Sequence, residues 1–288
     1  MEGAAWTPPD DVLTRAAPPP DLVIRYGAGA EHVADVRLPR RRLGSTAPPA
    51  PLVIFLHGGF WRARYDRAHT GPMATALAGA GYAVCVPEFR RTGQPGGGWP
   101  GTFEDVAAAA DRSPALVREA AGPDVIANEP ALLAGHSAGG HLALWAAGRH
   151  RLGPDSAWRS ALRAGGVVVL AGVSGLADCY EQGLGDGAAA ALMGGGPGQF
   201  PQRYRDADPA VLLPVGCPVR LVHGALDDVV PPSMSRGYAA LGRAAGDDAT
   251  VTELPGASHL DVIDPLSPAW PRVMAAFKDL TPVALSSP

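Results

Sequence analysis

Short, continuous apolar runs recur along this chain of 288 residues, and segments of helical composition lie between them. Such runs are too short for helices and suit strands that are buried on both faces of a parallel sheet. Their alternation with helices indicates βαβ units and an α/β fold, in which helices flank a mainly parallel central sheet. The expected strands are residues 22–26, 32–38, 52–56, 82–86, 131–134, 166–170, 218–223 and 250–254, and the expected helices are residues 67–80, 102–121, 138–149, 233–245 and 268–280.

Two segments do not fit this alternation. Residues 1–20 are rich in proline, which predicts an extended N-terminal arm. Residues 174–213 are polar and rich in glycine, with one short helix expected at residues 186–193. We expect this second segment to form a small cap over the carboxyl end of the sheet, inserted in a single domain that spans residues 21–288.

A Gly-His-Ser-Ala-Gly sequence at residues 135–139 follows an apolar run and precedes a helix-forming segment. This is the strand, turn and helix context of a nucleophile elbow, in which a strained turn lifts a serine hydroxyl off the end of a sheet. Both glycines are needed because side chains there would collide with the neighbouring strand and helix. Ser137 is therefore the expected nucleophile.

A serine nucleophile needs a base to take its proton and a carboxylate to orient that base. Histidine suits the role of base because its pKa lies near neutral pH. His259 stands in the loop after the last expected strand, and two adjacent aspartates, Asp227 and Asp228, stand in the turn after the strand before it. Both segments follow strand carboxyl ends, where ligands bind in open parallel sheets, so we expect these groups to meet Ser137 at one rim.

Backbone N–H groups that stabilise a negatively charged oxygen complete a site of this kind. One donor is expected from Ala138, the residue after the nucleophile. The others are expected from the loop after strand 52–56, which reads His-Gly-Gly-Phe-Trp at residues 57–61. Its two glycines allow the backbone to approach a substrate closely.

Composition and charge exclude several other classes of protein. The net charge of -4 gives no electrostatic basis for binding nucleic acid or anionic membranes. The 3 cysteines form neither a disulfide framework nor a zinc motif, and no histidine pair has metal-ligand spacing. The sequence has no signal-peptide pattern and no apolar stretch long enough to span a membrane. We therefore expect a cytoplasmic protein without cofactor or metal, whose partner is a small acyl substrate.

These motifs resemble those of the α/β-hydrolase superfamily over residues 20–280. Residues 57–61 match the HGGxW motif of the kynurenine formamidases (arylformamidases), and the sequence around Ser137 resembles the GHSAGGH elbow of that group. The resemblance implies that the N–H groups of Gly59 and Phe60 bind the oxyanion. The turn that holds the two aspartates resembles that of prolyl-oligopeptidase-type hydrolases, in which the first aspartate of the pair is the catalytic acid. This resemblance favours Asp227 and leaves Asp228 as the alternative.

The sequence leads to three hypotheses on function. The first is a serine hydrolase that cleaves a small amide or ester through an acyl-enzyme, and the resemblance extends this to an N-formyl aryl amine such as N-formylkynurenine. The second is a general carboxylesterase or small-peptide hydrolase, and the third is a non-catalytic binding protein on the same fold. Trp61, Phe89 and Trp99 are candidates for an aromatic wall around an aryl substrate, with packing in the core and rim as the alternative.

Overall fold

The computed structural model describes residues 11–40, 48–122, 124–161 and 163–281, and these form an 8-stranded sheet in the order β1-β2-β4-β3-β5-β6-β7-β8. Strands β4, β3, β5, β6, β7 and β8 run parallel to one another, whereas β1 and β2 form an antiparallel hairpin beside β4. The mainly parallel sheet expected from the sequence is confirmed. Its strands are β1 Leu22–Arg25, β2 Val33–Arg37, β3 Leu52–Leu56, β4 Ala83–Pro87, β5 Leu132–His136, β6 Gly166–Leu170, β7 Val219–Gly224 and β8 Ala249–Leu254.

Alternate residues of the central strands face two separate hydrophobic cores. In β3, Val53 and Phe55 belong to one core, whereas Leu52, Ile54 and Leu56 belong to the other. A strand covered on both faces in this way has no solvent-facing side. This is why its sequence is a continuous apolar run instead of an alternation of apolar and polar residues.

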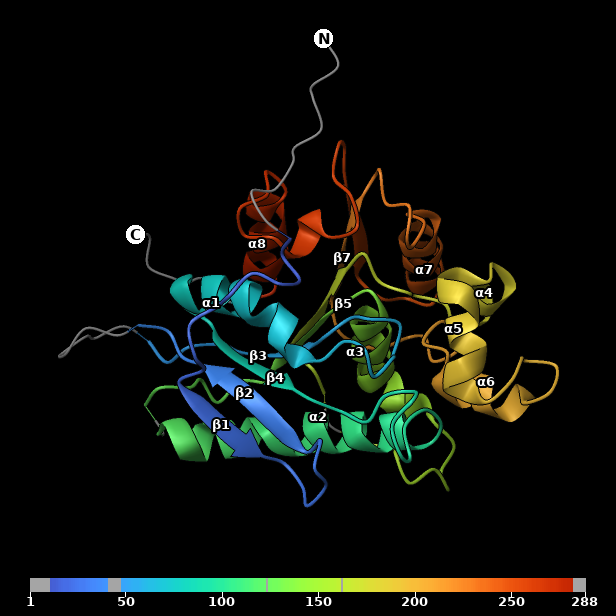
Figure 1. Ribbon diagram of the computed structural model, residues 1–288, viewed down its shortest axis with the longest axis horizontal. Coiled ribbons are helices and arrows are strands. Elements are labelled where there is room, and N and C mark those ends of the chain that lie inside the picture. Colours follow the sequence, from blue (N-terminus) through green and yellow to red (C-terminus); the bar gives the residue numbers. More distant parts are fainter. Residues whose placement is uncertain (1–10, 41–47, 123, 162, 282–288) are drawn as a thin grey trace, which may run out of the picture.

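Helices cover both faces of the sheet (Figure 1). On one face, α1 and α8 contribute apolar side chains to the same core as Val53 and Phe55, and α2, α3 and α7 contribute to the core on the other face. The helices are α1 Gly71–Gly79, α2 Gly101–Ala121, α3 Ala138–Gly148, α4 Leu176–Glu181, α5 Leu184–Met193, α6 Pro201–Ala207, α7 Ser233–Ala244 and α8 Trp270–Asp279, with 3-10 turns η1 Arg67–Thr70, η2 Arg149–Arg151 and η3 Asp261–Ile263.

The helix expected over residues 67–80 is divided in two. A 3-10 turn, η1, is followed by α1, which begins at Gly71 with Pro72 in its first turn. Proline lacks a backbone N–H and is favoured in the first turn of an α-helix, where that N–H would have no partner. The helix therefore starts at this point, and the residues before it fold as a separate turn that Asp66 caps by accepting a hydrogen bond from the N–H of Ala68.

The segment expected to form a cap contains three helices where the sequence analysis expected one. Helices α4, α5 and α6 lie together at one end of the molecule, beyond α3 (Figure 1). The short helix expected at residues 186–193 is part of α5. Its first turn is irregular, because Gly185, Asp186 and Gly187 all have left-handed backbone angles.

The described part of the expected N-terminal arm packs against the rest of the chain. Val12 is buried in the core that α1 and α8 cover, and the Arg15 guanidinium pairs with the Asp264 carboxylate at 2.5 Å. The backbone oxygen of Pro19 accepts a hydrogen bond from Arg37 at 3.1 Å. Residues 1–10 of that arm lie outside the described residues. Within the described ranges, no helix combines the length and the apolar character needed to cross a membrane.

Candidate active site

Ser137 stands at the sharp turn between β5 and α3. Its backbone angles are φ 55° and ψ -122°, in a region that side-chain-bearing residues rarely adopt. A Cβ on Gly135 would lie 2.2 Å from the Gly139 oxygen, and a Cβ on Gly139 would lie 2.0 Å from the Leu56 oxygen at the end of β3. Only glycine fits at either position, so the local sequence forces the strained turn that carries Ser137.

Asp227 and His259 meet at the same edge of the sheet. Asp227 lies in the turn after β7 and His259 in the loop after β8, and the His259 Nδ1–H donates a hydrogen bond to Asp227 Oδ2 at 2.7 Å. This contact leaves Nε2 of His259 as the nitrogen that can take a proton. Asp228 is exposed, whereas the Asp227 side chain is fully buried. The geometry thus assigns the orienting carboxylate to the first aspartate of the pair.

The Asp227 carboxylate has hydrogen-bond donors on both oxygens. Oδ1 accepts from the N–H groups of Val229 and Val230 at 2.9 and 2.8 Å, Oδ2 accepts from His259, and Nε2 of a second histidine, His223, lies 3.1 Å from Oδ2. Burial raises the pKa of this carboxyl, but the hydrogen bonds from His223 and His259 outweigh burial and bring the pKa well below its ordinary value. Asp227 is therefore ionised at neutral pH.

His136 ties the loop that carries His259 to the nucleophile turn. Its Nε2–H donates a hydrogen bond to the backbone oxygen of His259 at 3.0 Å, and the two rings lie 4.6 Å apart. Burial, followed by the charge of His259, holds the pKa of His136 well below its usual range, so that this ring is neutral. Within the described ranges, the Ser137 hydroxyl makes no hydrogen bond to the imidazole of His259; such contacts are often long until substrate binds.

The loop after β3 contains consecutive residues with left-handed backbone angles. Gly59, Phe60 and Trp61 have φ values of 109°, 50° and 55°. Among the described residues, none accepts a hydrogen bond from the backbone N–H of Gly59, Phe60 or Ala138. A Cβ on Gly58 would lie 3.3 Å from the Cβ of Ser137, so the loop runs directly beside the nucleophile turn. Backbone donors left unpaired next to a serine are what an oxyanion site requires.

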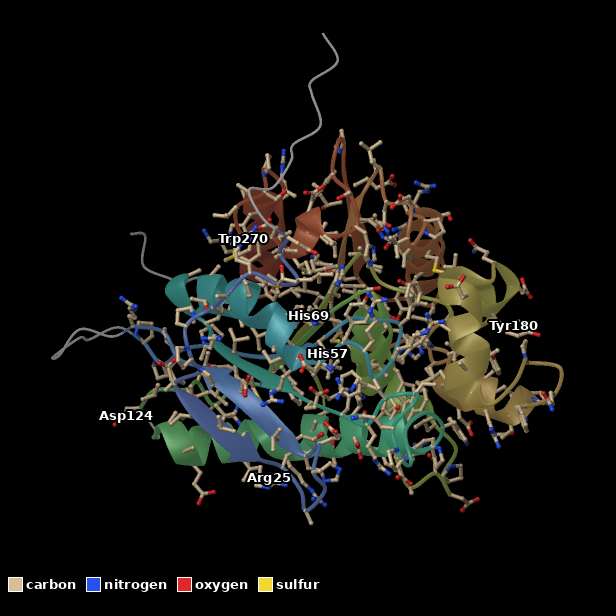
Figure 2. All side chains as sticks on the ribbon, viewed as in Figure 1. Arg25, His57, His69, Asp124, Tyr180 and Trp270 are labelled. Atoms are coloured by element: carbon tan, nitrogen blue, oxygen red, sulfur yellow. The ribbon has the colours of Figure 1, made fainter. Side chains whose placement is uncertain are left out.

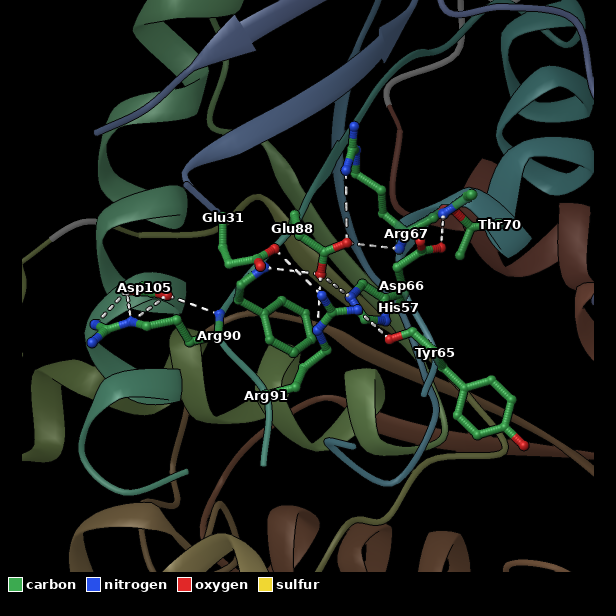
Figure 3. A network of polar contacts seen from close by, with 12 residues as sticks. Glu31, His57, Tyr65, Asp66, Arg67, Thr70, Glu88, Arg90, Arg91 and Asp105 are labelled. Carbon is green, nitrogen blue, oxygen red and sulfur yellow. Dashed lines mark hydrogen bonds and ion pairs between the residues drawn. The ribbon is translucent and has the colours of Figure 1, made fainter. Parts of the chain in front are cut away.

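A buried carboxylate, Glu88, is hydrogen-bonded to His57 at the start of this loop (Figure 3). Glu88 Oε1 accepts a hydrogen bond from His57 Nε2–H at 2.9 Å, and Oε2 accepts one from the N–H of Arg67 at 3.0 Å. Burial raises the pKa of Glu88, but the His57 contacts, the Arg67 N–H and the charge of Arg91 outweigh it and lower the pKa to about 2. The sequence analysis did not identify Glu88, although a charged residue at the carboxyl end of a buried strand was a signal for it.

The three aromatic candidates occupy different surroundings. Trp61 and Phe89 are both buried in the core, and the Phe89 ring stacks on His57 at 4.3 Å. Trp99 is half-buried and packs edge-on against Trp158 at 4.8 Å. His57 lies near the middle of the molecule, whereas Tyr180 marks the outer edge of the cap helices (Figure 2). Packing accounts for the contacts of Trp61 and Phe89, and of the three only Trp99 has substantial exposed surface.

Comparisons with known proteins agree with this architecture. The chain is 29% identical over 255 residues to the esterase LipC of Mycobacterium tuberculosis, and the match covers 84% of this chain and 60% of that protein. A truncated carbohydrate esterase from gut microbiota has the same fold with a TM-score of 0.71 at 22% identity, covering 89% of this chain and 94% of that one. Esterase B from Lactobacillus rhamnosis gives a TM-score of 0.70 at 20% identity, covering 92% and 86%.

The family model BD-FAE matches residues 35–240, which is more than half of the chain. The matched range runs from β2 into α7 and includes the nucleophile elbow, the loop after β3 and the acid turn. The structural relatives share the mainly parallel sheet with flanking helices and are esterases with the α/β-hydrolase fold. The chain therefore belongs to the BD-FAE family and has the α/β-hydrolase fold.

Proposed function

We propose that this protein is a serine carboxylesterase that cleaves small esters through an acyl-enzyme. The observation that carries the proposal is the hydrogen-bonded pair of His259 and Asp227, held at the same sheet edge as the strained serine of the elbow. A serine hydroxyl alone is a weak nucleophile. Hydrolases activate it with an imidazole that a carboxylate orients.

In the proposed reaction, the Ser137 hydroxyl attacks the ester carbonyl while His259 Nε2 takes its proton. The unpaired N–H groups of Gly59, Phe60 and Ala138 stabilise the oxyanion of the tetrahedral intermediate. His259 then returns the proton to the leaving alcohol, and the acyl group remains on Ser137. Water, activated by the same imidazole, releases the acid. Asp227 holds the His259 tautomer and stabilises the imidazolium formed in each half-reaction.

Esters are favoured over formamides as substrates. The named relatives are an esterase of Mycobacterium tuberculosis, a carbohydrate esterase and a bacterial esterase B, whereas the resemblance to kynurenine formamidases depends on the HGGxW and elbow motifs alone. The residues of those motifs bind the oxyanion in related enzymes and do not determine which acyl group is accepted. An aryl formamide is therefore the second candidate substrate, and only the two motifs support it.

The experiment compares kcat/KM for p-nitrophenyl acetate and butyrate, N-formylkynurenine and an aminoacyl p-nitroanilide. We expect the short esters to be cleaved fastest, and Ser137→Ala to abolish turnover of all of them. Ser113→Ala, which changes a buried serine on α2 away from the site, is the matched control and should keep wild-type rates. N-formylkynurenine as the best substrate would overturn the preference for esters, and ester turnover by Ser137→Ala would overturn the mechanism.

A further inference from the structure

A second buried histidine contacts the carboxylate that orients His259. His223 stands in β7, four residues before Asp227, and has no exposed surface. Its Nε2 lies 2.9 Å from the backbone oxygen of Val230 and 3.1 Å from Asp227 Oδ2. Its Nδ1 lies 2.7 Å from the hydroxyl of Ser235, which is on α7 and is also fully buried. Both ring nitrogens are therefore fixed by partners from different elements.

These partners determine which nitrogen of His223 carries a proton. The two groups at Nε2 are a carbonyl oxygen and a carboxylate oxygen, and both are acceptors, so Nε2 must carry hydrogen. Nδ1 then accepts a hydrogen bond from the Ser235 hydroxyl, which can rotate to donate. In this arrangement Ser235 fixes the tautomer of His223, and the single Nε2–H of His223 is shared between the Val230 oxygen and the Asp227 oxygen that also accepts from His259.

We propose that His223 is a positioning residue for catalysis, which acts by fixing the Asp227 carboxylate that orients His259. The inference rests on the proposed function, because it assigns a role within that reaction. Without the His223 donor, Oδ2 of a fully buried carboxylate keeps only the bond from His259. The carboxylate is then free to rotate toward the remaining donors on Oδ1 and to draw the imidazole with it. Misplacing a catalytic base in this way slows proton transfer more than it weakens substrate binding.

Loss of the donor has a second consequence, which a purely structural role would not produce. The titratable groups around Asp227 are His223 from β7, His259 from the loop after β8 and His136 at the end of β5. The hydrogen bond from His223 is the first of the contacts that offset burial of the carboxyl. When it is removed, the pKa of Asp227 rises, and the carboxylate pairs less strongly with the imidazolium that His259 forms during the reaction, which lowers kcat.

The experiment compares three variants of the full chain with wild type, using p-nitrophenyl butyrate. His223→Leu removes the donor, His223→Gln retains an N–H group on a side chain of similar reach, and Ser235→Ala removes the group that fixes the tautomer. His32→Gln is the control, because His32 also bonds to a carboxylate, that of Asp105 at 2.8 Å, but stacks on Tyr26 outside the site. Thermal unfolding and fluorophosphonate labelling verify that each variant is folded and retains a reactive serine.

We expect His223→Leu to lower kcat roughly 10- to 100-fold with KM within about twofold, the size of effect that a lost hydrogen bond to a charged group produces. Ser235→Ala should show a smaller loss of kcat, and His223→Gln should recover most of the rate. His32→Gln should match wild type.

The proposal is wrong if folded His223→Leu changes only the melting temperature, if folded Ser235→Ala keeps the wild-type kcat, or if His223→Gln loses as much kcat as His223→Leu. Inactivity of wild type on every ester, or turnover by Ser137→Ala, would instead count against the proposed function. The two failures are therefore distinguishable in one set of measurements. If His223→Leu does not fold, Ser235→Ala decides the question, because a folded variant with wild-type kcat would overturn the proposal.

Discussion

The ring of Phe60 lies directly against the backbone of Gly185, so that the loop beside the nucleophile touches α5. A Cβ on Gly185 would lie 2.6 Å from the Phe60 ring, and Gly185 itself has a left-handed φ of 59°. Next to Phe60, the Arg62 guanidinium donates hydrogen bonds to the backbone oxygens of Gly185 and Asp186. The irregular first turn of α5 thus packs on the strained segment that carries the proposed oxyanion donors.

Gly185→Ala should therefore lower esterase kcat/KM, by roughly tenfold, because the new methyl group pushes the Phe60 ring and moves the Phe60 N–H away from the oxyanion. The left-handed angle adds about 1–2 kcal/mol of strain wherever alanine replaces glycine. A double-mutant cycle with Phe60→Ala separates the two effects, since the strain is present in both backgrounds. Equal losses in the Phe60 and Phe60→Ala backgrounds would mean that the contact has no effect on catalysis.

Replacement of the two adjacent aspartates should have very different results. Asp227→Asn presents an amide to His259 Nδ1 and favours the wrong tautomer, so we expect kcat to fall on the order of 10⁴-fold. Asp228 is exposed, and Asp228→Asn should change kcat by no more than about twofold. Steady-state kinetics of the two variants on the same ester test this directly. Comparable losses from both would argue that the acid turn rearranges in solution.

Glu88 should make the stability of the protein depend on pH in acid. Its folded pKa of about 2 lies below the ordinary value of 4.5, so the charged carboxylate stabilises the folded state above pH 4.5, and this contribution is lost as the pH falls toward 2. The shift sets an upper bound on the order of 3 kcal/mol. Glu88→Gln should lower the free energy of unfolding most near neutral pH, and the deficit should shrink below pH 4.5. A deficit independent of pH in urea titrations would contradict the assignment.

The sequence predicted the sheet because its strands are buried on both faces and therefore appear as unbroken apolar runs. It also predicted which loops would converge, because Ser137, Asp227 and His259 each follow the carboxyl end of a parallel strand. The elbow glycines were predictable for a steric reason, because a Cβ atom at Gly135 or Gly139 would overlap a backbone oxygen.

The helices within residues 174–213 and the polar contacts next to the site could not be predicted in the same way. The turn at Gly183 and Gly185 depends on left-handed angles that leave no apolar periodicity in the sequence. Glu88 and His223 act through contacts with residues from other strands and loops, and single-sequence patterns do not specify such pairings. For the same reason the aromatic candidates were ambiguous: Phe89 stacks on His57 in the core, a contact that its sequence neighbours do not indicate.

The reactive serine can be identified most directly by locating the adduct of a fluorophosphonate probe through peptide mass spectrometry. The proposed mechanism predicts one modified residue, Ser137, with loss of esterase activity in proportion to labelling and no labelling of Ser137→Ala. Full activity with Ser137 modified, or an adduct on another serine that accounts for the loss of activity, would contradict it.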